Sequence, residues 1–236
     1  MKKSSPALSG NRLLARLPLK DFQSLNRHLQ LTPLEFEQVL YEAHAPLDYA
    51  YFPVKGVLSA ITIMENGDGI EVATVGNEGM LGLPTFVEAG ASPYRVIVQA
   101  EGSAYRISAS ALADMVNRNT AFRRLMSLYQ SAFLAQVSQC VACNGLHTVV
   151  KRCCRWLLTT HDRLEADELP LTHEFLAMML GVRRPSVTDV LKQLVKKGLI
   201  RHGWGKITVL DLKGLERAAC ECYRAVNQEF ARIFGR

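Results

Sequence analysis

The chain has 236 residues, of which 48% are hydrophobic, enough for one large domain or two modest domains with buried cores. Its formal charge of +6 is confined to residues 147–236, which carry 16 basic and 10 acidic residues, whereas residues 1–146 carry 12 of each, so only the second half has an electrostatic reason to approach nucleic acid. The sequence has no apolar run long enough to span a membrane and no signal-peptide core, so we expect a cytoplasmic protein without membrane contact.

The first hundred residues predict a helical lead followed by a small β domain. Short helical segments are expected over 11–17 and 19–29. Glycine-rich turns then separate short alternating apolar runs, at 57–63, 70–75, 96–100 and 104–107. Short strands at regular spacing are typical of a small barrel or sandwich.

Helical spacing returns after residue 107. Ser108 and Ser110 can cap a helix that extends to Val116, and a long helix begins near Thr120. A stripe of mostly apolar residues recurs along this long helix at steps of three and four: Phe122, Met126, Tyr129, Phe133, Val137 and Cys140. Such a stripe is typical of a coiled-coil seam, so we expect these six residues to join two copies of the chain in a homodimer.

A further helix over 148–164 leads into a helix-turn-helix motif, LTHEFLAMMLGVRRPSVTDVLKQLVKKGLI. Thr172 is a good N-cap, and Gly181 stands where the first helix of the motif must turn. Pro185 fits the first turn of the second helix, which Gly198 ends. Two β-type runs around the Gly-x-Gly tip at 203–205 then predict a wing, and the tail over 212–234 predicts an amphipathic helix packed on the winged domain.

The second helix of the motif carries side chains suited to DNA. Residues at the N-terminal end of a recognition helix reach base edges, where Arg can bind guanine and Asp can accept from cytosine. Lysines along the helix and in the wing are better suited to phosphates, which position the protein without reading sequence. The predicted DNA-binding residues are Arg183, Arg184, Pro185, Ser186, Thr188, Asp189, Lys192 and Lys206.

The order of these elements resembles the cyclic AMP receptor protein and fumarate-nitrate reductase regulator (CRP/FNR) family. The resemblance covers nearly the whole chain, and its strongest local matches are the motif above, the wing GWGKITVLD and the β-domain phrase YFPVKGVLSAI. It implies an α+β fold with an N-terminal cyclic-nucleotide-binding-like β-roll (1–118), a dimerisation helix (119–146) and a winged helix-turn-helix domain (147–236). It also implies a bacterial homodimeric transcription regulator, either an activator or a repressor, that binds a palindromic operator and that would contact RNA polymerase if it is an activator.

The chain departs from the family's nucleotide pocket. The resemblance places that pocket at Gly79, Gly82, Leu83, Tyr94 and Arg95, but Leu83 stands where relatives place the ribose-binding Glu, and Tyr94 stands where they place the phosphate-binding Arg. Arg95 is one residue out of register, which turns a strand side chain to the opposite face. We therefore expect cyclic AMP not to be the effector, and a different small anion, a metabolite or an empty relic pocket remain alternatives.

The six cysteines raise a separate possibility. Iron–sulfur relatives place their ligands near the N-terminus, but this chain has no cysteine before Cys140. Cys140, Cys143 and His147 could sense a metal or redox state, but Cys140 is more simply a small apolar residue of the helix seam. Cys153 and Cys154 point apart on a helix, and Cys220 and Cys222 lack a clear partner histidine, so no metal or other cofactor is assigned.

Two rival functions are weaker than a transcription regulator. Gly76-x-x-Gly79-x-x-Gly82 is not a dinucleotide fingerprint, and no catalytic constellation stands out, so we do not expect an enzyme. A cyclic-nucleotide-binding module that only docks proteins would not need a basic recognition helix and wing.

Overall fold

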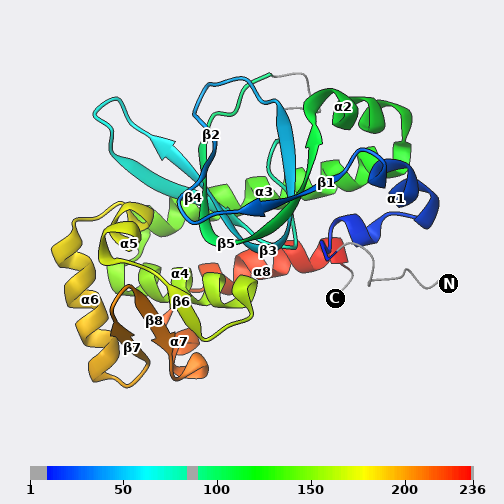
Figure 1. The fold of residues 1–236 in the computed structure, drawn as a ribbon. Coiled ribbons are helices and arrows are strands. Elements are labelled where there is room, and N and C mark those ends of the chain that lie inside the picture. Colours follow the sequence, from blue (N-terminus) through cyan, green and yellow to red (C-terminus); the bar gives the residue numbers. More distant parts are fainter. Residues whose placement is uncertain (1–9, 84–89, 235–236) are drawn as a thin grey trace.

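A β domain, a long helix and a smaller mixed domain follow one another along the chain in a computed structural model that describes residues 10–83 and 90–234 (Figure 1). The elements of the first part are η1 (Leu14–Arg16), α1 (Leu19–Asn26), β1 (Gln30–Leu34), β2 (Val39–Tyr41), β3 (Tyr49–Ile63), β4 (Gly69–Val75), β5 (Arg95–Ser108), α2 (Ala109–Arg118) and α3 (Thr120–Leu146). Those of the second part are α4 (Val149–Leu164), β6 (Glu168–Pro170), α5 (His173–Leu180), α6 (Arg184–Lys196), β7 (Ile200–Gly203), β8 (Lys206–Val209), α7 (Leu212–Ala218) and α8 (Cys222–Phe234). The predicted α+β class is confirmed.

The β domain is one antiparallel sheet in the order β1-β5-β3-β4, with β2 also paired to β5. β5 is long because it joins the predicted runs at 96–100 and 104–107, and β3 extends the predicted run at 57–63 back to Tyr49. Register shifts at Pro53, Lys55 and Val57 bend β3 along its pairing with β5, which lets the sheet curl. Gly102 lies in this bend, where an added Cβ would fall 2.1 Å from the carbonyl oxygen of Lys55.

The long helix α3 packs against its own protomer through the stripe predicted as the dimer seam. Phe122, Met126 and Tyr129 have no exposed area, and Phe133 and Cys140 are each 6% exposed. They face the β domain and α8, and the hydroxyl of Tyr129 donates to the carbonyl oxygen of Met80 at 2.8 Å. Of the residues predicted as the dimer seam, Phe122, Met126, Tyr129, Phe133 and Cys140 are thus buried within their own protomer, and Val137 is half-buried.

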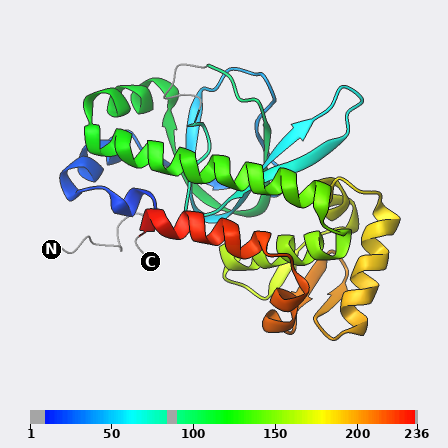
Figure 2. The same ribbon diagram turned by 180° about the vertical axis from the view of Figure 1, so that it is seen from behind.

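The C-terminal helix α8 also lies elsewhere than predicted. Figure 2 shows it running beside α3, away from the winged domain, and the two helices contact each other along much of α8. The rings of Phe230 and Tyr129 lie 6.2 Å apart, and Ile233 joins the core of the β domain. α7 packs on the winged domain, where Leu215 enters the core, and the first turn of α8 also contacts it through Tyr223, which donates to Asp162 of α4.

Buried polar contacts join the two domains. Arg163 of α4 pairs with Glu78 at 2.8 Å and also reaches Thr74 of β4 and Gln136 of α3. Both charged side chains of this pair are less than 10% exposed. This pair and the contacts around it fix α4 against the β domain.

A second buried network lies closer to the middle of α4. Trp156 donates its indole N–H to Glu71 of β4 at 2.8 Å, and Ser59 of β3 lies 2.7 Å from the other carboxyl oxygen. Gln99 of β5 accepts from Ser59 and donates to Thr160 of α4.

No helix in the described part of the chain has the length and apolar character to cross a lipid bilayer.

Candidate nucleic-acid interface

Local capping and turn chemistry build the helix-turn-helix. The hydroxyl of Thr172 accepts from the backbone N–H of Phe175 at 3.1 Å and caps α5. Gly181 ends α5 with φ of +59°, a left-handed conformation that favours glycine. Pro185 lies in the first turn of α6, where its missing N–H costs no hydrogen bond.

The recognition helix α6 divides cleanly into a buried and an exposed face. Its buried residues are Val187, Val190, Leu191 and Leu194. The predicted DNA-binding residues of the motif lie on the other side: Arg183, Arg184, Pro185, Ser186, Asp189 and Lys192 are exposed and Thr188 is half-buried. The structure therefore places seven of the eight predicted residues on α6 and its N-cap, away from the buried face.

The wing stands beside this surface and supplies the eighth residue. β7 and β8 form a hairpin whose tip is Trp204 and Gly205, and β6 adds a third strand that the sequence pattern did not indicate. Trp204 is fully exposed at this tip. Lys206 contacts both carboxyl oxygens of Glu168 at 3.0 Å, so its ammonium is held at the edge of the wing.

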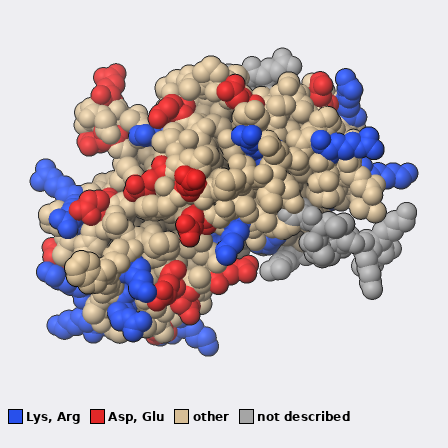
Figure 3. All heavy atoms as spheres, in the orientation of Figure 1, with Lys and Arg blue, Asp and Glu red and all other residues tan. Residues whose placement is uncertain are grey.

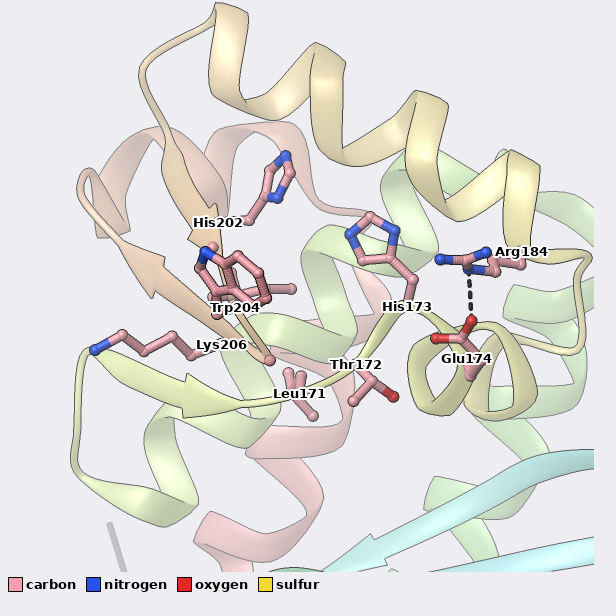
Figure 4. Close-up of a pocket in the computed structure, with 11 residues that line it drawn as sticks. Leu171, Thr172, His173, Glu174, Arg184, His202, Trp204 and Lys206 are labelled. Atoms are coloured by element: carbon pink, nitrogen blue, oxygen red, sulfur yellow. Dashed lines mark ion pairs between the residues drawn. The ribbon is translucent and has the colours of Figure 1, made fainter.

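A hollow separates the wing from the start of α5 and α6 (Figure 4). Arg184 forms an ion pair with Glu174 across one side of it, with 2.6 Å between Nε and Oε1, and both side chains are about two-thirds exposed. His173 lies within 3.1 Å of the Thr188 hydroxyl and packs edge-on against His202. Partial burial, together with His202 and Arg184, lowers the pKa of His173, which favours the neutral ring.

Positive surface charge is concentrated near the recognition helix and the wing. In Figure 3, Lys and Arg side chains gather at the end of the molecule that carries α6, β7 and β8, and a smaller group lies near α1 and α2 at the opposite end. Lys192, Lys196, Lys197 and Arg201 join Arg183 and Arg184 as exposed cations on and beside the recognition helix. This end of the molecule has the charge that a phosphate backbone attracts.

The residues assigned to an effector pocket are mostly engaged within the protein. An added Cβ on Gly79 would fall 2.3 Å from the hydroxyl oxygen of Tyr129, so the glycine is needed for packing on α3. Gly82 has φ of +104° and lies against Ala50, and Leu83 is 9% exposed. Each of these three residues thus has a packing role that needs no ligand.

Tyr94 and Arg95 also have partners in the protein. The ring of Tyr94 lies 6.3 Å from that of Phe133 on α3. Arg95 forms an ion pair with Glu42 at 3.4 Å.

Two family models match the chain in adjacent parts. Residues 32–119 match the cyclic nucleotide-binding domain, and residues 151–218 match the Crp-like helix-turn-helix domain. The chain is 44% identical over 59 residues to the transcriptional regulator SdrP of Thermus thermophilus, a match that spans 25% of this chain and 29% of that regulator.

Solved structures share the whole architecture. A Crp/Fnr-family regulator from Eubacterium rectale superimposes with a TM-score of 0.68 at 18% identity, covering 89% of this chain and 98% of that one. A CRP/FNR-family regulator from Thermus thermophilus superimposes with a TM-score of 0.67 at 23% identity, covering 80% and 98%. At these identities the likeness establishes the fold. Because the β domain and the helix-turn-helix both match domains of one family, in that family's order, the chain belongs to the CRP/FNR family of transcription regulators.

Proposed function

We propose that this protein is a cytoplasmic, homodimeric regulator that binds a palindromic operator through α6 and the wing, and that it is not an enzyme. The observation that carries this proposal is the exposed, basic face of α6 in a Crp-like helix-turn-helix, beside a wing with its own cations. Helices of this kind enter the major groove with their N-terminal residues against base edges.

The proposed contacts divide into two kinds. Arg183, Arg184, Ser186, Thr188 and Asp189 face the bases, since they surround the first two turns of α6. Lys192 and Lys206 contact phosphates on either side, and Pro185 shapes the first turn of the helix. Glu174 holds Arg184 in the free protein and orients the guanidinium before DNA arrives.

The homodimer is proposed to form through the outer face of α3, opposite the buried stripe. This face carries Leu134 and Val141, which are 63% and 65% exposed. Small residues continue the seven-residue pattern on the same face: Ser127, Ser131, Ser138 and Gly145. Residues 125–150 contain no Lys, Arg, Asp or Glu, so two copies can pack here without burying charge.

The sensor is proposed to respond to something other than cyclic AMP. Leu83 offers no acceptor for a ribose hydroxyl, and Arg95 is already paired with Glu42. A nucleotide phosphate would have to displace this ion pair.

Salt dependence of DNA binding tests the proposal without knowledge of the operator. Affinity for a random duplex should fall steeply with salt, because bound Lys and Arg displace counterions. Lys192→Ala and Lys206→Ala should each reduce the logarithmic salt slope by about 1. Lys20→Ala, an exposed cation on α1, is the matched control and should leave the slope unchanged. A flat salt response, or an equal effect of Lys20→Ala, would refute the assignment of the interface.

A further inference from the structure

Three cysteines and a histidine meet where α3 ends and α8 begins. Cys143, His147, Cys220 and Cys222 place one ligand-type atom each within 4.8 Å of every other. The three cysteines are at most 4% exposed and form a small cluster of their own, separate from the two main cores. None of these four residues belongs to the proposed DNA interface.

Local structure explains how residues so far apart in sequence come together. Cys143 and His147 are four residues apart at the C-terminal end of α3, so they share one face of the helix. Cys220 and Cys222 are two residues apart, and in a continuous helix they would point in different directions. The chain between α7 and α8 is extended at Ala219, and this break lets both thiols face the same point.

Two of the six separations between the ligand atoms match those around a single tetrahedral ion, and all six are within 4.8 Å. Cys143 Sγ and Cys220 Sγ lie 3.5 Å apart, and Cys222 Sγ and His147 Nδ1 also lie 3.5 Å apart. Zinc bonds of about 2.3 Å to sulfur and about 2.0 Å to nitrogen place tetrahedral ligands roughly 3.5–3.8 Å from one another. An iron–sulfur cluster needs its ligands spread around several iron atoms, so it fits this spacing poorly.

Neighbouring polar groups are arranged as they are around known metal sites. The other ring nitrogen of His147, Nε2, lies 3.3 Å from a carboxyl oxygen of Glu221. Such a carboxylate fixes the histidine tautomer and leaves Nδ1 free to bind a metal. The amide of Gln139 donates to Cys222 Sγ at 3.1 Å, which is how thiolate ligands are commonly supported.

Two buried arginines favour an anionic group at the same place. Arg152 and Arg155 of α4 interact electrostatically with Cys143, and among the described residues their Nε atoms are buried without a hydrogen-bond partner. Three thiolates on a divalent ion carry a net charge of −1, which would lie beside these two cations.

We infer that Cys143, His147, Cys220 and Cys222 bind one zinc ion, which ties the end of the long helix to the start of α8. Three soft thiolates and one imidazole form a closed set of four ligands, typical of structural zinc. The ion joins the α3–α4 connection to the link between α7 and α8, across the boundary between the sensor and DNA-binding parts. Arg152 continues this link, since its guanidinium donates to the carbonyl oxygen of Leu180 at the end of α5.

The inference bears on two points that the sequence left open or misjudged: the role of Cys140, and the partner of Cys220 and Cys222. Cys140 is not a ligand, because its thiol is directed to the carbonyl oxygen of Glu71 at 3.5 Å. Cys220 and Cys222 do have a partner histidine, His147, which lies more than seventy residues earlier in the chain.

Metal content of the full-length, tag-free protein tests the inference directly. The protein is purified from zinc-containing medium, desalted, and analysed for zinc, iron and acid-labile sulfide. We expect about one zinc per protomer and no iron or sulfide. Cys143→Ser and Cys222→Ser should lower the zinc content by at least tenfold, and Glu221→Ala should weaken zinc affinity by roughly tenfold. Cys140→Ser is the matched control, because it removes a buried thiol from the same helix, and it should keep its zinc.

The wild-type protein supplies a second readout if the cysteine variants do not fold. After chelation, Co²⁺ should bind stoichiometrically and give the intense thiolate charge-transfer and visible bands of a tetrahedral site, and Zn²⁺ should abolish them. Absence of zinc, iron with labile sulfide, a Cys143–Cys220 disulfide in freshly isolated protein, or cobalt bands unchanged in Cys222→Ser would each overturn the inference. None of these outcomes depends on whether the protein binds DNA.

Discussion

Glu71 offers a sharp test of how the two domains are joined, because it is a carboxyl buried between them. Burial raises its pKa from the ordinary 4.5 to about 7, although Ser59, Arg155, Arg163 and Trp156 act in the opposite direction. The hydrogen bonds around Glu71 also indicate a protonated carboxyl group. Ser59 has a single hydroxyl proton but lies within bonding distance of both Glu71 and Gln99. If Glu71 is protonated, it donates to Ser59, which donates to Gln99, and every acceptor in the chain is satisfied.

Glu71→Gln tests this protonation state, because an amide can still donate to Ser59 but cannot ionise. A folded-state pKa of about 7 against 4.5 unfolded means that the folded protein holds a proton that the unfolded chain has lost between these pH values. Wild-type stability should therefore be full below pH 4.5 and decrease as pH rises towards 7. At about 1.4 kcal/mol per pH unit, the loss amounts to at most about 3 kcal/mol above pH 7.

Urea unfolding at pH 5 and pH 8 measures this difference. Glu71→Gln should match the wild type near pH 5 and exceed its free energy of unfolding by up to about 3 kcal/mol at pH 8. Glu65→Gln, an exposed carboxyl in the β3–β4 turn, is the control and should shift neither value. A Glu71→Gln variant that is less stable than the wild type at pH 8, or equally changed at both pH values, would show that the carboxyl is ionised and paired in the folded state.

Three further outcomes follow from the geometry. Leu134→Asp should convert the dimer to folded monomers in sedimentation experiments, because it places a charge on the exposed face of α3. Phe133→Asp should instead unfold the protein, because Phe133 is buried. A Leu134→Asp variant that remains a dimer would refute the proposed face. Glu78→Ala should lower the free energy of unfolding by about 3 kcal/mol, because it leaves Arg163 buried and unpaired, and a loss under 1 kcal/mol in urea titrations would contradict this. Tryptophan fluorescence should change on DNA binding, mainly through the exposed Trp204 at the wing tip, and an unchanged signal in the wild type or an undiminished response in Trp204→Phe would place the wing away from DNA.

Much of the DNA-binding part could be predicted because its signals are local. Thr172, Gly181 and Pro185 each act within a few residues through a cap, a left-handed turn or a fixed φ, and the structure shows each in that role. The exposed cations of α6 follow directly from the helix phase that these residues set.

The face of α3 could not be assigned in the same way. This helix is covered by the β domain and α8 on one side and carries Leu134 and Val141 on the other, so apolar residues occur on both faces. Periodicity identifies a stripe but does not identify what covers it. The sequence does not indicate that α8 returns along α3, where it packs beside the long helix.

The cysteine cluster was hidden for a related reason. Cys143 and Cys220 are 77 residues apart, and their meeting depends on the path of the chain through the whole winged domain. A Cys-x-Cys pair and a Cys-x-x-x-His pair are each weak signals, and neither is within reach of the other in sequence. Tertiary structure alone turns two incomplete ligand pairs into a set of four.

The most direct test of the central claim is to incubate the purified protein with fragmented DNA from its source organism and to sequence the fragments that it retains. The account predicts enrichment of one palindrome whose half-sites are about one helical turn apart, and loss of that enrichment in Arg184→Ala. Retained fragments without a shared motif, in equal amounts for the wild type and Arg184→Ala, would contradict specific recognition through α6.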